Sequence, residues 1–175
     1  LRFDLTVPLA RYVAMNSQLK MPFKRYEMGP VFRDGPIKLG RYRQFWQCDI
    51  DTIGVKGMLA EAEQLALVQN AFQSLGIDVI IKVNNRKLLN GILEQCGIKE
   101  KESAIVAIDK LEKIGAKGVT EELSQRGYTK EQSEKLLGLL KEKITLKELK
   151  KKVKSAEGTQ GLQELEELFG YLKNM

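Results

Sequence analysis

The chain has 175 residues, 43% of them hydrophobic and 30% charged, which is enough for one or two globular domains with a buried core. It contains no histidine, and its two cysteines form no C-x-x-C pair, so Ser-His-Asp and Cys-His hydrolase chemistry is excluded and a metal or redox motif is unsupported. The net charge of +6, with a pI near 9.2, favours contact with polyanions.

No apolar run approaches the ~20 residues that span a bilayer, and no signal peptide is visible, so we expect no membrane contact and a cytoplasmic location. The first residue is Leu1 and not Met, and the sequence begins directly with a conspicuous motif. We therefore expect a fragment of a longer protein.

Two runs rich in apolar and aromatic residues, 25–32 and 42–53, flank a segment with the turn residues Asp34, Gly35, Pro36 and Gly40. This pattern predicts two antiparallel strands joined by a loop. Side chains alternate between the faces of a strand. One face of the second run would carry Arg41, Arg43, Phe45, Gln47, Asp49 and Asp51, and the other Tyr42, Gln44, Trp46, Cys48 and Ile50.

A polar face on a half-buried sheet needs either a partner or solvent, because burying an unpaired charge is costly. Two interpretations therefore stay open for this face. It is either a pocket for a charged ligand or a surface that faces water.

Residues 58–75 carry apolar residues at helical spacing and end at Gly76, which predicts an amphipathic helix. The β-branched run 78–83 predicts another strand, and Asn84 or Asn85 is expected to cap a following helix. Strands and helices in this order indicate an α+β fold with helices covering one side of an antiparallel sheet.

From about Gly97 the sequence becomes rich in lysine and glutamate. Thr129 with Gln132, and Thr145 with Glu148, have capping-box spacing and predict helix starts. Gly127, Gly158 and Gly161 are expected to punctuate these helices, and Cys48 and Cys96 are expected to be reduced thiols in or near the core.

Residues 141–154 contain seven lysines and two glutamates. Four of the lysines have the spacing i, i+3, i+4 and i+7 and are predicted to share one helix face: Lys147, Lys150, Lys151 and Lys154. Such a face suits RNA, although exposed lysine-rich helices also serve solubility.

Three segments resemble histidyl-tRNA synthetase, a class II aminoacyl-tRNA synthetase, and in particular its archaeal and eukaryotic cytosolic branch. They are LRFDLTVPLARYVAMN at 1–16, KRYEMGPVFRDGPIKLGRYRQFWQCDIDTIG at 24–54 and NNRKLLNGILEQCGI at 84–98. The second is similar to motif 2 of these enzymes in its histidine-specific form, and the first to the loop that grips the amino group of histidine.

The resemblance implies an α+β fold that combines a partial class II antiparallel sheet, flanking helices and a small all-helical insertion domain. Residues 1–96 would be the catalytic core with the motif 2 hairpin. Residues 97–160 would be the insertion that approaches the tRNA acceptor stem, and residues 161–175 a helix returning to the core.

The resemblance also implies residue roles. Arg33 would be the catalytic arginine, contacting the carboxylate of the amino acid and the α-phosphate of ATP. Arg41 would reach the ATP phosphates, while the role of Asp34 stays open. The remaining amino-acid-binding residues would be Asp4, Thr6, Gln47 and Asp51, and the tRNA-binding residues Lys147, Lys150, Lys151 and Lys154.

The implied reaction converts L-histidine and ATP, with Mg²⁺ bound to the nucleotide, into histidyl-adenylate and then charges tRNA(His). The full-length enzyme would be a homodimer without a protein-bound metal. Counterparts of motif 1, motif 3, the second histidine-specific motif and an anticodon-binding domain are not found in the chain, so we expect it to be inactive by itself.

Two other functions stay open. One is the synthetase-like regulatory subunit of ATP phosphoribosyltransferase in histidine biosynthesis, which shares the fold but has lost aminoacylation. The other is a non-catalytic RNA-binding or scaffold fragment, in which the polar face of the hairpin is solvated.

Overall fold

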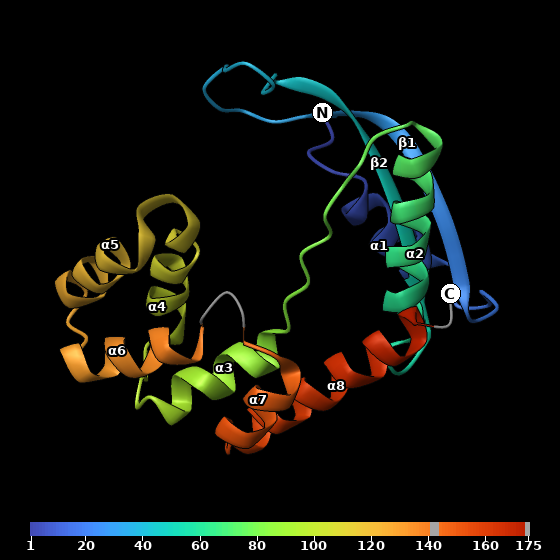
Figure 1. Cartoon of the computed structure of the whole chain (residues 1–175). Helices are drawn as coiled ribbons and strands as arrows, with labels where there is room; N and C mark the ends of the chain where they lie inside the picture. The colour runs from blue at the N-terminus through green and yellow to red at the C-terminus, as the bar shows by residue number, and fades with distance from the viewer. Residues whose placement is uncertain (141–143, 174–175) are drawn as a thin grey trace. The chain divides into compact units, whose positions relative to one another are not determined.

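The structure is a computed structural model that describes residues 1–140 and 144–173 (Figure 1). It divides into two compact units, Leu1–Leu67 and Val68–Met175, with the boundary inside a helix. In chain order the elements are α1 (Thr6–Met15), β1 (Phe23–Phe32), β2 (Gln44–Ile53), α2 (Leu59–Ser74), α3 (Arg86–Gln95), α4 (Lys101–Ile108), α5 (Leu111–Gln125), α6 (Lys130–Leu139), α7 (Leu146–Lys152) and α8 (Ala156–Leu172). Helices with a small antiparallel sheet agree with the predicted α+β class, whereas the insertion domain stays a prediction.

The hairpin of β1 and β2 is the framework of the first unit, and it confirms the two predicted strands. The strands are antiparallel, with Arg25 opposite Asp51 and Gly29 opposite Gln47. Along the first half of β2 the odd-numbered side chains are half-buried and the even-numbered ones exposed. The face that carries the odd-numbered side chains of both strands is called the odd face below.

Helix α1 occupies much of the segment that the family resemblance presents as a binding loop. It begins where the carboxylate of Asp4 accepts a hydrogen bond from the backbone N–H of Val7, over 3.0 Å. Pro8 lies in the first turn, where a backbone N–H has no partner within the helix and its loss is tolerated. Leu5, just before the helix, and Leu9, in its first turn, are buried, so the N-terminal end of α1 contributes to the apolar core of the first unit.

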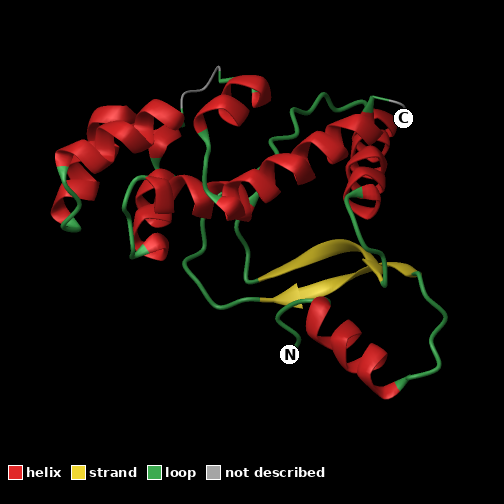
Figure 2. Ribbon diagram, turned by 90° about the horizontal axis from the view of Figure 1, so that it is seen from below, coloured by secondary structure: helices red, strands yellow, loops and turns green. Residues whose placement is uncertain are grey.

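The two faces of the hairpin are covered by different elements (Figure 2). Arg25 donates to the carbonyl oxygen of Leu5, just before α1, whereas its neighbour Lys24 pairs with Glu63 of α2 over 2.6 Å. Because consecutive side chains of a strand point to opposite faces, α1 and the start of α2 lie on opposite sides. The prediction that helices cover one side of the sheet is therefore wrong, since a two-stranded ribbon has two faces to cover.

The predicted strand at 78–83 is also wrong: in the part of the chain that the structure describes, this run has no regular secondary structure and belongs to no sheet. It follows Gly76, whose φ of 68° ends α2 as the sequence predicted. The side chain of Ile80 is 90% exposed. A strand needs a neighbour for its backbone N–H and C=O groups, and the β-branched sequence by itself does not provide one.

In the second unit α3 and α8 lie side by side (Figure 1), and glycines let their backbones approach closely. A Cβ atom added to Gly161 would lie 2.3 Å from the backbone nitrogen of Leu88, and one added to Gly91 would lie 2.3 Å from that of Gly158. Gly158 and Gly161 therefore do not separate helices, although the sequence led us to expect that they would. They lie inside α8, which begins at Ala156.

Two carboxylates of α8 reinforce this packing. Glu164 pairs with Lys87 and accepts from the side-chain amide of Asn85 over 2.7 Å, while Glu157 accepts from that of Asn90 over 3.0 Å. The hydrogen bond from Lys87, and then that from Asn85, lowers the pKa of Glu164, and the hydrogen bond from Asn90 is the main cause of the lowered pKa of Glu157.

The predicted helix starts are confirmed. Thr129 with Gln132, and Thr145 with Glu148, form complete capping boxes at the starts of α6 and α7. Asn85 caps α3, as one of the two expected residues.

The two cysteines differ in environment. Cys96 is buried as predicted, and burial raises the pKa of its thiol, with partial opposition from the charge of Lys135. Cys48 is exposed, so its prediction as a core or near-core thiol is wrong. It lies on the even-numbered face of β2, beyond the part near Thr52 that contacts α2.

A helix that crosses a bilayer needs about 20 mostly apolar residues. No helix within residues 1–140 and 144–173 meets this requirement, and α8, with 17 residues, carries several glutamates.

Candidate active site

Arg33 directly follows β1 and extends its side chain over the odd face. Its backbone N–H donates to the carbonyl oxygen of Arg43 over 2.8 Å, which continues the hairpin by one residue. In its side chain, Nη2 donates to Oε1 of Gln47 over 3.1 Å and Nε donates to the carbonyl oxygen of Phe3 over 3.3 Å. Two separate segments, β2 and the N-terminal stretch, therefore fix the orientation of the guanidinium.

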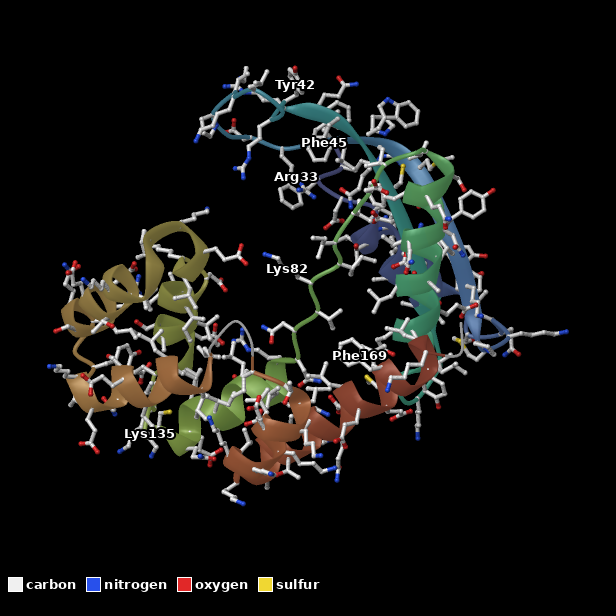
Figure 3. The ribbon with its side chains drawn as sticks, viewed as in Figure 1. Arg33, Tyr42, Phe45, Lys82, Lys135 and Phe169 are labelled. Carbon is white, nitrogen blue, oxygen red and sulfur yellow. The ribbon has the colours of Figure 1, made fainter. Side chains whose placement is uncertain are left out.

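Aromatic rings also contact this guanidinium. The Cζ atom of Arg33 lies over the rings of Phe3 and Phe45, at 4.7 and 5.1 Å from their centroids. Figure 3 shows Arg33 and Phe45 together toward the loop end of the hairpin, with Tyr42 nearer the loop. These cation–π contacts use the faces of the planar group, whereas its edges donate hydrogen bonds, here to Phe3 and Gln47, and such edges are the parts that bind oxyanions bidentately.

Gln47 connects Arg33 to the carboxylates further along β2. Its amide oxygen accepts from Arg33, and its Nε2 donates to Oδ1 of Asp49 over 2.8 Å. Asp51, two residues further on, accepts from Nε of Arg25 over 3.0 Å. The odd face thus carries Gln47, Asp49 and Asp51 of β2, as the alternation predicted, and these side chains lead from the Arg33 guanidinium to carboxylates.

The segment before α1 is anchored to β1 at both ends. The carbonyl oxygen of Arg2 accepts from the backbone N–H of Phe32 over 2.9 Å, and that of Leu5 accepts from Nη2 of Arg25 over 2.9 Å. Asp4 lies between these two anchors, so the structure brings it to the side of the hairpin that carries the odd face.

Asp4 is half-buried and Thr6, the first residue of α1, is exposed. The oxygen Oδ1 of Asp4 already accepts from the N–H of Val7. The structure therefore gives Asp4 a part in starting α1, and its predicted part in ammonium binding, like that of Thr6, stays a prediction.

A cavity of about 530 Å³ lies at the loop end of the hairpin. Its lining residues are Arg33, Asp34, Gly35, Pro36, Gly40, Arg41, Tyr42 and Phe45. Arg41 belongs to the loop, where its backbone pairs with that of Lys38, and it precedes β2 instead of lying on it. Two guanidinium groups on one cavity favour an anionic ligand with several oxygens. The structure brings Arg33 and Arg41 together here, and Gln47 and Asp51 are not among the lining residues.

The described part of the chain has no cluster of side chains suited to bind a metal ion. Among residues 1–140 and 144–173, no three Asp, Glu, Cys or His side chains are grouped so that they could hold one.

The predicted lysine face is only partly formed. Lys147, Lys150 and Lys151 lie on α7, but the helix ends two residues before Lys154, so the prediction that all four share one helix face is wrong. Lys150 pairs with Glu166 of α8 over 2.9 Å. Two other lysines of the basic segment, Lys141 and Lys143, lie outside the described residues.

Sequence reasoning missed Phe3 and Arg25, which contact the predicted site residues. Period-two alternation, applied to the first strand as it was to the second, would have placed Arg25 on the same face as Arg33. No comparable signal identifies Phe3, because its contact depends on the path of the chain before α1.

Comparison with known proteins gives consistent results. The profile of the family described as Histidyl-tRNA synthetase matches residues 1–175. Histidine–tRNA ligase 1 of Bacillus cereus is 44% identical over 176 residues, which cover 98% of this chain and 41% of that protein. Histidine–tRNA ligase 2 of Shouchella clausii is 46% identical, covering 98% and 42%, and the histidine–tRNA ligase of Cytophaga hutchinsonii is 43% identical, covering 97% and 39%.

The chain thus spans about two fifths of the length of these relatives. All three come from bacteria, and the likeness to the archaeal and eukaryotic branch stays a prediction.

Proposed function

Because the chain belongs to the histidyl-tRNA synthetase family, we propose that it supplies the histidine and ATP site of a histidine–tRNA ligase. The full-length enzyme would join L-histidine and ATP into histidyl-adenylate and pyrophosphate, and then transfer the histidyl group to tRNA(His). One observation carries this proposal: the guanidinium of Arg33 is hydrogen-bonded to Gln47, and Arg33 lines the same cavity as Arg41.

In the first step, a carboxylate oxygen of histidine attacks the α-phosphorus of ATP, and the bond to pyrophosphate breaks. Negative charge then gathers on oxygens around phosphorus, so catalysis consists of positioning and charge stabilisation, without a general base. Arg33 is suited to this, because its planar fork can contact a carboxylate and a phosphate oxygen together. Arg41 would hold the outgoing phosphates across the same cavity.

The amino-acid end would lie along the odd face, further from the loop. Gln47 and Asp51 follow Arg33 in that direction, and the segment that carries Asp4 and Thr6 is bonded to β1 beside them. A carboxylate pairs with an ammonium, and a hydroxyl can accept another of its protons. Histidine would thus bind with its carboxylate toward Arg33 and its ammonium toward the carboxylates.

Mg²⁺ would enter with ATP and neutralise charge on its phosphates. We assign no ligand of this chain to it, since the phosphate oxygens themselves are good ligands for this hard cation.

For the second step we propose that residues 97–160 act as an insertion facing the acceptor stem of tRNA, between the core at 1–96 and the returning helix at 161–175. Lys147 and Lys151 of α7 are exposed and are the best placed of the four predicted lysines for phosphate contact. The enzyme would work as a homodimer.

The test is ATP–pyrophosphate exchange by the full-length protein, with histidine compared against the other amino acids. We expect exchange that depends on histidine. If exchange is absent for every amino acid while the protein binds ATP phosphoribosyltransferase, the protein is the regulatory paralogue. If exchange is absent and RNA is still bound, the scaffold interpretation holds.

A further inference from the structure

One guanidinium joins three parts of the first unit. Arg25 of β1 donates from Nε to Oδ2 of Asp51 over 3.0 Å and from Nη2 to the carbonyl oxygen of Leu5 over 2.9 Å, and its Nη1 pairs with Glu27. Its side chain is 15% exposed, less than that of Asp51 at 24% or Glu27 at 32%. Arg25 is thus the most buried member of this polar cluster.

These contacts use the three directions in which a guanidinium donates. A buried guanidinium must satisfy its N–H groups, and its planar shape fixes the angles between its partners. Since Arg25 lies directly opposite Asp51 in the hairpin register, its bond to this carboxylate crosses from β1 to β2. Its bond to Leu5 links the hairpin to the segment before α1.

Both partners adjoin residues of the proposed histidine pocket. Leu5 separates Asp4 from Thr6, so holding its carbonyl oxygen holds the backbone on either side of it. Asp51 is itself a proposed pocket residue, and the contact of Oδ2 with Arg25 sets the direction of its carboxylate.

We propose that Arg25 is a positioning residue for histidine binding, an inference that rests on the function proposed above. It holds the Asp51 carboxylate and the Asp4–Thr6 segment at a fixed separation, so that both sides of the pocket meet the same substrate. Its positive charge lies against the carboxylates of both Asp51 and Glu27 and so offsets the repulsion between these two like charges.

The position of Arg25 predicts that its replacement weakens the binding of one substrate selectively. Arg25 is not among the residues that line the cavity at the loop end, where ATP phosphates are proposed to bind. Replacing it should therefore affect histidine much more than ATP. A residue that served stability only would lower the amount of folded enzyme and with it the apparent kcat, without a selective rise in histidine KM.

The experiment uses the full-length enzyme and compares Arg25→Met, Arg25→Lys and the control Lys24→Met. Lys24 is the neighbouring cation on β1, and its pair with Glu63 lies on the opposite face. Histidine KM, ATP KM and kcat are measured by pyrophosphate exchange, and folding is followed by thermal unfolding.

For Arg25→Met we expect histidine KM to rise by about tenfold or more, as for loss of a charge-assisted contact, with ATP KM changed less than about twofold. Arg25→Lys keeps a cation beside Asp51 but cannot donate in three fixed directions, so it should fold well and still show a raised histidine KM. Lys24→Met should leave both KM values near those of the unsubstituted enzyme.

Unchanged histidine KM in Arg25→Lys and Arg25→Met, or equal changes for both substrates, would overturn the positioning role and leave the proposed function intact. If Arg25→Met does not fold, Arg25→Lys decides the question. Absence of histidine-dependent exchange in the unsubstituted enzyme would instead refute the proposed function, and this inference with it.

Discussion

Arg33, just after β1, is hydrogen-bonded to Gln47 of β2, with Nη2 of the arginine 3.1 Å from Oε1 of the glutamine. An N–H of Nε2 in the same amide donates to Oδ1 of Asp49, so the orientation of the amide is fixed at both ends. Because an amide is both donor and acceptor, Gln47 can lie between a cation and a carboxylate without an unpaired group.

Substitution at this position should separate the two substrates. We expect Gln47→Ala and Asp51→Ala to raise histidine KM by about 10- to 100-fold, the effect of losing a hydrogen bond to a charged group, with a smaller change for ATP. Pyrophosphate exchange at varied histidine and varied ATP measures both. Gln44→Ala is the matched control, since this glutamine lies at the start of β2 with its side chain on the exposed face. Equal losses for both substrates would show that the amino-acid pocket has been misplaced.

Lys147 and Lys151 provide a prediction about tRNA. If each of these two lysines contacts one phosphate, the double variant Lys147→Ala/Lys151→Ala should bind tRNA more weakly. The plot of log affinity against log salt concentration should also become less steep, with the magnitude of its negative slope reduced by up to about 1.8. The matched control is Lys113→Ala/Lys117→Ala, two exposed lysines of α5. Filter binding over a range of salt concentrations measures this slope. Equal effects of the two pairs would mean that α7 makes no particular contact.

The crossing of α3 and α8 predicts a stability effect. Gly161→Ala would place a methyl group 2.3 Å from the backbone nitrogen of Leu88, so the helices must move apart. We expect this variant to lose about 1–3 kcal/mol of unfolding free energy, a typical cost of overpacking, as measured by urea denaturation. Gly170→Ala in the same helix is the control, because a Cβ there meets no described atom within 4 Å. A loss no larger than that of the control would mean that the helices pack less closely.

Glu164 predicts how stability depends on pH. Its pKa is lowered from the ordinary value of 4.5 by the hydrogen bonds from Lys87 and Asn85, so the folded state favours the ionised form. The stabilisation is fully present above pH 4.5 and is lost as the pH falls through the lowered pKa.

Glu164→Gln should therefore unfold more easily at neutral pH, and its difference from the unsubstituted protein should shrink in acid. Thermal unfolding between neutral and acid pH measures this, with Glu94→Gln, an exposed residue of α3, as the control. If the difference in unfolding temperature between Glu164→Gln and the unsubstituted protein does not change with pH, the ion pair of Glu164 with Lys87 is not its cause.

The sequence predicted those features of the structure that depend on interactions between residues close together in the chain. The capping boxes at Thr129 and Thr145, the cap at Asn85 and the alternation of β2 each depend on contacts within a few residues. The polar face that collects Gln47 and Asp51 was predicted for the same reason.

The errors occur where the outcome depends on distant partners. The run at 78–83 has the composition of a strand, but pairing needs a second backbone. Gly158 and Gly161 look like helix breakers, yet close contact with α3 requires them inside α8. Cys48 follows the alternation but lies on the exposed face, because coverage of that face depends on where α2 lies.

The role of Arg33 is tested most directly by ATP–pyrophosphate exchange in the full-length enzyme carrying Arg33→Ala, with histidine as the amino acid. We expect exchange to fall by at least about 100-fold, because charge stabilisation is lost, while the unfolding temperature changes little. Exchange close to that of the unsubstituted enzyme would contradict the assignment of Arg33 to the reacting phosphate, and with it the proposed site.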